Sequence, residues 1–293
     1  MLSQELLKKV RLIEISTRRV VDEVVSGQYK SHFKGQGVQF SEHRLYVAGD
    51  DVRHIDWKVS ARTREPLIKK FDEERELNVF LVVDISGSQS FGSKDQLKSE
   101  VAAQLGGVLA YAASHTGDQV GLLLFAGEVE RVIPPRKGRQ HILRLIRELL
   151  VAKPTTPGTD LASALESTGR IMKHRGVIFL ISDFMAQGYE RALRKLAKKH
   201  DVVALQLSDE REKRLPDLGQ VLFFHPETEQ ECLVDTSSYE FRKWFTQYQK
   251  EFETKTRSVF KSNRVESLVI STQENYGDAV IRFFQARSRK RKS

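Results

Sequence analysis

FLVVDISGSQSFG, residues 80–92, is the stretch of this 293-residue chain that decides its fold. Residues 77–83 form an apolar run rich in β-branched side chains, which is the pattern of a strand buried on both faces. Such a strand lies in the middle of a sheet that helices cover. The strand ends at Asp84, and serine and glycine follow. We therefore expect an α/β domain with Asp84 at one edge of its sheet.

Oxygen-bearing side chains occupy alternate positions after this strand, at Asp84, Ser86 and Ser88. Because successive side chains of an extended segment alternate in direction, these three point to one side. Mg²⁺ prefers oxygen ligands at about 2.0–2.1 Å, so the loop must curl to bring them together. Gly87 lies between the two serines and permits such a curl. The pattern therefore predicts a site for a hard cation.

This spacing resembles the Asp-x-Ser-x-Ser signature of the metal-ion-dependent adhesion site in von Willebrand factor A-like domains. In that family a threonine on a later loop and an aspartate after a later strand complete the ligand shell. Here Thr159 precedes a predicted helix, and Asp183 ends the apolar run 177–182. The resemblance implies that Mg²⁺, or Mn²⁺ or Ca²⁺, is bound by Asp84, Ser86, Ser88, Thr159 and Asp183. In the alternative interpretation, these side chains only cap helices and close turns.

The composition is that of a globular protein, with 40% hydrophobic and 30% charged residues. No apolar run approaches the roughly 20 residues that span a bilayer, and Glu5 and Glu14 interrupt the segment where a signal peptide would be apolar. The single cysteine, Cys232, excludes an internal disulfide and a cysteine-based zinc cluster. We expect a cytoplasmic location.

The net charge of +9 is concentrated at the C-terminus. Five basic residues lie within residues 287–293, and the chain without them carries +4. We interpret this segment as a basic tail that is solvated or, alternatively, contacts nucleic acid or anionic lipid. Nucleic acid is the less favoured partner.

Residues 1–76 differ in composition from the rest of the chain. An amphipathic helix is predicted over residues 2–25, and a β-rich, glycine-punctuated segment follows. Within it, RLYVAGDDVRHIDWKVSAR, residues 44–62, resembles the signature of the bacterial family called domain of unknown function 58. That family joins this signature to a von Willebrand A-like domain. The resemblance implies a partner, a MoxR-type AAA+ ATPase, and a role as an adaptor in chaperone-like assembly or maturation.

The charged residues of this signature predict a hydrogen-bonded network. Carboxylates of Asp50, Asp51 and Asp56 are expected to pair with guanidinium groups around Trp57. The network would be structural or, alternatively, a docking surface for a partner. Its members are Arg44, Tyr46, Asp50, Asp51, Arg53, Asp56, Trp57 and Arg62.

Residues 77–286 alternate between predicted strands and helices, which favours a mostly parallel, doubly wound sheet with helices on both faces. Ligands of such sheets bind beyond the carboxyl ends of the strands, where Asp84 and Asp183 both fall. A hairpin insertion is predicted over residues 221–235, with its turn at residues 226–229. The helix predicted over residues 238–262 carries an aromatic stripe that we assign to the core: Phe241, Trp244, Phe245, Tyr248 and Phe252.

Enzyme signatures are incomplete in this chain, so we expect a non-enzymatic protein interaction module. The alternative is a nucleotide-binding or phosphotransfer enzyme that uses residues 84–94 as a phosphate-binding loop. Gly87 and Gly92 have the right spacing for that loop, but Ser93 and Lys94 stand in the wrong order. A dehalogenase-like phosphatase needs a carboxylate where Ser86 stands, and a serine hydrolase needs a glycine two residues before its nucleophile.

Overall fold

The computed structural model of the chain describes residues 39–72, 77–93, 96–224 and 230–290. The helix predicted over residues 2–25 and the predicted turn at residues 226–229 lie outside these ranges, as does Lys94. Within the described part of the chain, no helix is long and apolar enough to cross a membrane.

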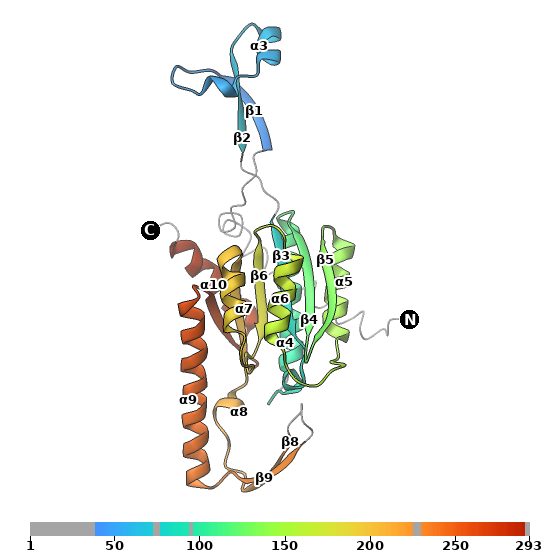
Figure 1. Cartoon of the computed structure of the whole chain (residues 1–293), viewed down its shortest axis with the longest axis vertical. Helices are drawn as coiled ribbons and strands as arrows, with labels where there is room; N and C mark the ends of the chain where they lie inside the picture. Colours follow the sequence, from blue (N-terminus) through green and yellow to red (C-terminus); the bar gives the residue numbers. More distant parts are fainter. Residues whose placement is uncertain (1–38, 73–76, 94–95, 225–229, 291–293) are drawn as a thin grey trace.

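A six-stranded sheet forms the centre of the molecule (Figure 1). All neighbouring strands in it are parallel except the last pair, β4 and β5, which is antiparallel. The predicted fold class, a doubly wound and mostly parallel α/β sheet, is confirmed. The strands follow one another across the sheet as β10 (Glu266–Ser271), β7 (Asp201–Ser208), β6 (Val177–Ser182), β3 (Asn78–Asp84), β4 (Gln119–Phe125) and β5 (Val129–Arg136).

Strand β3 has the central place that its apolar sequence predicts. Val79, Leu81 and Val83 belong to the core on one face of the sheet, and Phe80 and Val82 to the core on the other. This alternation follows from the two-residue period of a strand. Burial on both faces explains why residues 79–83 include no polar residue, whereas Asn78 lies at the partly buried start of the strand.

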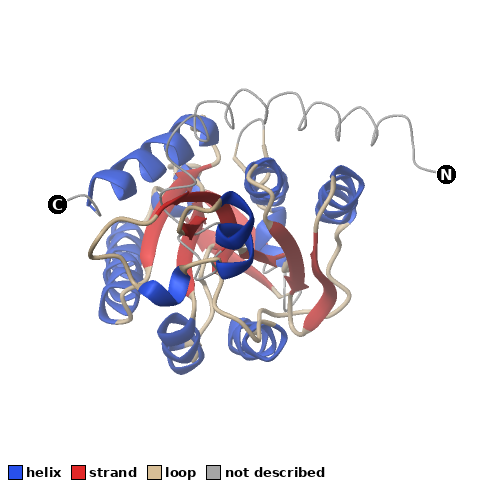
Figure 2. Cartoon of the chain, turned by 90° about the horizontal axis from the view of Figure 1, so that it is seen from above, coloured by secondary structure: helices blue, strands red, loops and turns tan. Residues whose placement is uncertain are grey.

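Helices cover both faces of the sheet (Figure 2). One face packs against α4 (Lys98–His115), α5 (Arg139–Val151) and α10 (Tyr276–Lys290). The other packs against α6 (Leu161–Ile171), α7 (Glu190–Lys199) and the C-terminal end of α9 (Tyr239–Ser262).

Helix α10 runs through residues that we assigned to a basic tail. Arg287 is 7% exposed, and its guanidinium group donates two hydrogen bonds of 2.6 Å to the Asp201 carboxylate. It also pairs with Glu266 at 2.8 Å. Arg287 is therefore part of the folded domain, because carboxylates at the amino ends of β7 and β10 compensate its charge.

Residues 39–72 form a small unit of their own beyond the amino end of β3 (Figure 1). Strand β1 (Gln39–Leu45) pairs antiparallel with β2 (Leu67–Asp72). A 3₁₀ turn, η1 (Val52–His54), and a short helix, α3 (Trp57–Thr63), connect the two strands.

The segment between β7 and β10 leaves the sheet. It contains a one-turn helix, α8 (Glu210–Lys213), and the predicted hairpin, whose strands are β8 (Gln220–Phe224) and β9 (Glu231–Asp235). Helix α9 follows and is 24 residues long.

The prediction that the aromatic stripe of α9 belongs to the core is wrong for the N-terminal half of the helix. Trp244 is 58% and Tyr248 49% exposed, and the buried residues of α9 are Thr256 and Phe260 near its end. The physical reason is length, because only the C-terminal part of this helix reaches the sheet (Figure 1).

Candidate metal site at the carboxyl edge of the sheet

The register of β3 against β6 brings the two predicted aspartates to the same edge. Val83 is paired with Ile181, so Asp84 lies beside Ser182, and Asp183 follows directly. The Ser182 hydroxyl donates a 2.6 Å hydrogen bond to Asp84 Oδ2. Both carboxylates are buried, with exposed fractions of 1% and 3%.

The serine loop curls into a 3₁₀ turn, η2 (Gly87–Ser90). The Asp84 carboxylate accepts the Ser86 N–H at 2.9 Å, and this contact starts the curl. The hydroxyl oxygens of Ser86 and Ser88 are 3.2 Å apart. Ser88 donates to Asp183 Oδ2 at 2.8 Å across 95 residues of sequence. The predicted curl is present, and it is a 3₁₀ turn in which Gly87 has no positive φ.

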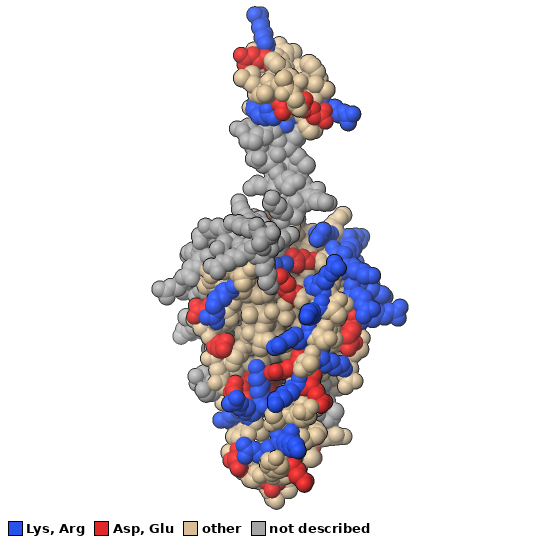
Figure 3. Space-filling model, turned by 90° about the vertical axis from the view of Figure 1, so that its left-hand side faces the viewer, with Lys and Arg blue, Asp and Glu red and all other residues tan. Residues whose placement is uncertain are grey.

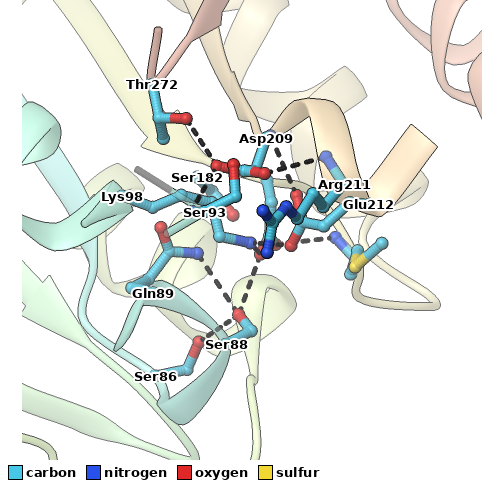
Figure 4. Close-up of polar contacts among 12 residues, drawn as sticks. Ser86, Ser88, Gln89, Ser93, Lys98, Ser182, Asp209, Arg211, Glu212 and Thr272 are labelled. Atoms are coloured by element: carbon cyan, nitrogen blue, oxygen red, sulfur yellow. Dashed lines mark hydrogen bonds and ion pairs between the residues drawn. The ribbon is translucent and has the colours of Figure 1, made fainter. Parts of the chain in front are cut away.

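A lysine that the sequence analysis did not select completes this cluster. Lys98 is fully buried at the start of α4, and its ammonium nitrogen lies 2.8 Å from Asp183 Oδ2 and 2.5 Å from Glu212 Oε1. Figure 4 shows Ser86 and Ser88 on one side of Lys98, and Asp209 and Thr272 on the other. The Thr272 hydroxyl and the Ser93 N–H both donate to Asp209, which fixes the start of α8.

The charges of this buried cluster do not balance. It contains the carboxylates of Asp84, Asp183 and Glu212 but only the ammonium group of Lys98. Burial and the nearby negative charge of Asp183 raise the pKa of Asp84 far above its usual range. A divalent cation beside the two aspartates would bring the total charge of the four side chains and the ion to zero.

Thr159 lies on a loop that the structure fixes at the same edge. The N–H of its neighbour Asp160 donates to Ala126 O at 2.7 Å, just after the end of β4, and β4 adjoins β3. Glu130 on β5 accepts the N–H groups of Thr155 and Thr156 at 2.8 and 3.0 Å. Thr159 is half-buried between these two anchors.

The donor set fits a hard divalent cation. Hydroxyl and carboxylate oxygens are the ligands that Mg²⁺ prefers, and the pair of serine hydroxyls is already preformed. The Gln89 side chain is 1% exposed, and its amide oxygen has no hydrogen-bond partner among the described residues. The described residues contain no group of three or more His, Cys, Asp or Glu side chains that could hold a metal ion, so this candidate site depends on hydroxyl oxygens as well as on carboxylates.

The backbone just after the site is strained. Phe184 has φ +61°, a value that bulky residues rarely adopt, and its side chain is 1% exposed. Its N–H donates to Ser182 Oγ, and its ring packs edge to face on Phe260 at 4.9 Å. These contacts hold the sharp turn that directs Asp183 toward Ser88 and Lys98.

The charged residues of the segment 44–62 do not form the predicted network around Trp57. Arg44 makes a two-pronged pair with Asp50, at 2.7 and 2.6 Å. Asp51 and Asp56 cap η1 and α3 instead, because their carboxylates accept backbone N–H groups there. Asp56 also contacts His43 and Lys69, whereas Trp57 is 69% exposed. Within the described residues, the side chains of Arg53 and Arg62 make no ion pair, and Tyr46 is half-buried.

Four residues of the site were missed in the sequence analysis. Ser182 was the one polar residue in an otherwise apolar strand and so left a weak signal, whereas Lys98 opens α4 beside the polar residues Ser99 and Glu100 and left none. Gln89 and Glu212 left none, because glutamine and glutamate are ordinary residues in surface loops and short helices.

The doubly wound sheet, with hydroxyl and carboxylate groups gathered at its carboxyl edge, places the chain in the class of mostly parallel α/β domains. Within this class, the chain belongs to the family described as "Protein of unknown function DUF58", whose model matches residues 42–255.

Relatives of the chain include "Uncharacterized protein Rv1480" of Mycobacterium tuberculosis (strain ATCC 25618 / H37Rv). It is 34% identical over 221 residues, which is 74% of this chain and 70% of the relative.

Solved structures of similar shape include an aerotolerance-related membrane protein from Bacteroides fragilis NCTC 9343. It has a TM-score of 0.49 and 16% identity, over 73% of this chain and 99% of that one. The SpRpn10 VWA domain has a TM-score of 0.40 and 10% identity, over 70% and 94% of the two chains. Because both TM-scores are below 0.5, the family assignment depends on the sequence match.

Proposed function

We propose that this chain is a non-enzymatic protein interaction module whose contact with a partner depends on a divalent cation. Ser86 and Ser88 would coordinate the ion directly, Thr159 directly or through water, and Asp84 and Asp183 mainly through water. The ion, as Mg²⁺ or as Mn²⁺ or Ca²⁺, would supply an electrophilic centre with one coordination position open to a partner's carboxylate.

One observation carries this proposal, namely that two buried acidic side chains, Asp84 and Asp183, lie against the paired serine hydroxyls at the carboxyl edge of the sheet. Unpaired carboxylates are rarely buried, because the cost of removing a charge from water is large without a compensating cation. The ammonium group of Lys98 pairs with the carboxylates of Asp183 and Glu212. The part of the cluster near Asp84 and the two serines has no such group among the described residues.

Hydrogen bonds within the chain orient the proposed metal ligands. Asp84 orients the loop through the Ser86 N–H, and Ser182 in turn orients Asp84. Lys98 and Ser88 fix the rotamer of Asp183 by sharing its Oδ2. Neutral hydroxyls next to the ion leave it electrophilic, which suits recognition of an anionic group.

Membership of the family supports a particular partner, a MoxR-type AAA+ ATPase, with this chain as its adaptor in chaperone-like assembly or maturation. The rival proposal, a phosphate-binding loop at residues 84–94, is opposed by the charges around it. Asp209 accepts the Ser93 N–H, and Asp84 and Asp183 lie behind the loop, so a phosphate would meet carboxylates.

The proposal is tested by affinity capture of the ATPase from the native cell. The unaltered chain and its Ser88→Ala variant are compared, each with Mg²⁺ and with chelator. We expect capture by the unaltered chain in Mg²⁺ alone. Equal capture of the ATPase by the Ser88→Ala variant would contradict the proposal that a bound cation joins the chain to its partner. Nucleotide hydrolysis by the purified chain that depends on Lys94 would favour the rival enzyme.

A further inference from the structure

A groove of about 600 Å³ lies between α8 and the N-terminal half of α9. Lys213, Arg214, Arg242 and Lys250 line it, together with the single acid Glu253 and the ring of Phe245. The charged residues of its lining therefore carry a net charge of +3. This groove is separate from the serine loop, and the function proposed above does not use it.

The basic side chains of the groove are weakly engaged within the chain. Lys213 lies 3.8 Å from Glu253, and Arg242 lies 3.4 Å from Asp217, with all four side chains between 37% and 56% exposed. Exposed pairs at such distances contribute little to stability, at most about 1 kcal/mol each. Carboxylates of another molecule can replace these partners at little cost.

A row of aromatic rings on the adjoining side of α9 meets the groove at Phe245. Phe241 packs against Phe245 in the groove at 6.2 Å and against Trp244 at 5.6 Å, and Trp244 stacks on Tyr248 at 5.6 Å. Trp244 and Tyr248 are among the most exposed large apolar side chains of the described part. Tryptophan, tyrosine and arginine are the residues that most often anchor protein interfaces. Figure 3 shows the face that carries α9, where lysine and arginine side chains are interspersed with uncharged surface.

Helix α8 contributes residues both to the cluster around Lys98 and to the groove. Helix α8 carries Glu212, which contacts Lys98 and through it Asp183, and the next residue, Lys213, lines the groove. Helix α8 therefore connects the buried cluster around Lys98 to the groove. The Asp209 cap, which accepts the Ser93 and Arg211 N–H groups at 2.9 Å each, fixes α8 between the two sites.

We propose that the groove binds an acidic, apolar-containing segment of a protein partner. Carboxylates of the segment would pair with Arg214, Arg242 and Lys250, and an apolar side chain would contact Phe245. The further claim that this is the same partner whose carboxylate completes the metal site rests on the proposed function. A continuous phosphate chain fits less well, because Glu253 and Asp217 interrupt the cations, whereas a peptide can space its charges.

The probe for this proposal is a fluorescently labelled synthetic peptide that alternates glutamate with leucine, and its counterpart has glutamine in place of glutamate. Binding to the full chain is followed by fluorescence anisotropy. The groove variant is Arg214→Glu with Lys250→Glu, both exposed. Its matched control is Arg191→Glu with Lys198→Glu on α7, which changes the net charge equally at exposed positions.

We expect the glutamate peptide to bind and the glutamine peptide not to bind. The groove variant should lose about tenfold or more in affinity, and the control should stay within about twofold. Equal losses in both variants would overturn the proposal, because they would show attraction to net charge alone. Tighter binding of oligo-deoxythymidine than of the peptide, lost in the groove variant, would also overturn it in favour of single-stranded nucleic acid.

The proposal for the groove and the proposal for the metal site can be tested separately, because their variants change the peptide affinity under different conditions. The groove variant should lose affinity for the peptide in chelator as well as in Mg²⁺. Ser88→Ala should lower the affinity only in Mg²⁺, since it removes the metal and not the cations of the groove. Peptide affinity that changes neither with Ser88→Ala nor with Mg²⁺ would support the groove proposal alone. It would contradict the claim that one partner occupies both sites.

Discussion

The ammonium nitrogen of Lys98 lies 2.8 Å from Asp183 Oδ2, in a part of the molecule where the lysine side chain is fully buried. Burial disfavours the charge of Lys98, but the carboxylates of Asp183 and Glu212 outweigh it and raise the lysine pKa. This pair connects α4 to the loop after β6 and, through Glu212, to α8. It is the structural link between the candidate metal site and the groove.

Removing the lysine charge should destabilise the fold. Lys98→Met leaves two carboxylates without their cation, and breaking a buried pair in this way costs about 3–5 kcal/mol. Urea denaturation measures the change in the free energy of unfolding. Lys198→Met, at an exposed position on α7, is the control and should change that free energy by less than about 0.5 kcal/mol. Equal effects of the two substitutions would mean that the Lys98 pair is energetically irrelevant.

Part of this loss should be recovered by a second substitution. Glu212→Gln removes one of the two uncompensated charges, so Lys98→Met with Glu212→Gln should be more stable than the sum of the single effects predicts. The coupling free energy from this double-mutant cycle should exceed about 1 kcal/mol. Strict additivity would contradict the 2.5 Å contact between the two side chains.

Two aromatic residues of α9 should differ in their contribution to stability. Phe260 is 2% exposed and packs on Phe184, so Phe260→Ala should cost about 3–5 kcal/mol. Trp244→Ala, at a position 58% exposed, should cost less than about 1 kcal/mol. Thermal or urea denaturation of both variants checks this. A large loss from Trp244→Ala would restore the interpretation of the whole stripe as core.

Gly121 on β4 should be intolerant of a methyl group for a specific reason. A Cβ at this position would lie 2.5 Å from two ring atoms of Phe80 in the neighbouring strand β3. Gly121→Ala should therefore cost about 1–3 kcal/mol through overpacking. In a Phe80→Leu background, which has more space there, the same substitution should cost less. If Gly121→Ala lowers the free energy of unfolding by the same amount in that background, contact with the Phe80 ring is not the cause.

His200 should make stability depend on pH. Burial lowers the pKa of His200 to about 4, and the charges of Lys199 and Arg175 act in the same direction. The unfolded chain binds this proton near pH 6.5, so between pH 6.5 and pH 4 the unfolded state carries more protons. The contribution of His200 to stability should therefore fall as the pH falls through this range, by up to about 3 kcal/mol.

The contribution of His200 is isolated by substitution. His200→Asn should flatten the pH dependence of the free energy of unfolding between pH 4 and pH 7. His174→Asn, at an exposed position, should leave it as steep as in the unaltered chain. If both variants keep the full slope, another group causes the acid sensitivity.

The sheet could be predicted from sequence because its central strands are apolar except at their ends. Residues 77–83 and 177–182 are buried on both faces, and this burial permits only a central place under helices. Asp84, Ser86, Ser88 and Asp183 could be placed at one edge because each follows such a strand. The contacts among them confirm that the four lie together.

The remaining parts depend on tertiary contacts that local sequence does not encode. Lys98 and Glu212 meet across 114 residues, and neither has a pattern that marks it as buried. The aromatic stripe of α9 has the spacing of a core-facing helix, but the helix extends beyond the sheet that would cover it. In residues 44–62, Asp50 pairs with Arg44, but Asp51 and Asp56 cap backbone N–H groups because they lie at the starts of η1 and α3.

The central claim is that the serine loop binds one divalent cation, and electron paramagnetic resonance of Mn²⁺ tests it most directly. Only free Mn²⁺ gives the sharp six-line signal, so titration counts the ions bound. We predict one site per chain, which Mg²⁺ competes for and Ser88→Ala abolishes without unfolding the protein. A folded, unaltered chain that leaves the free Mn²⁺ signal undiminished would contradict the account.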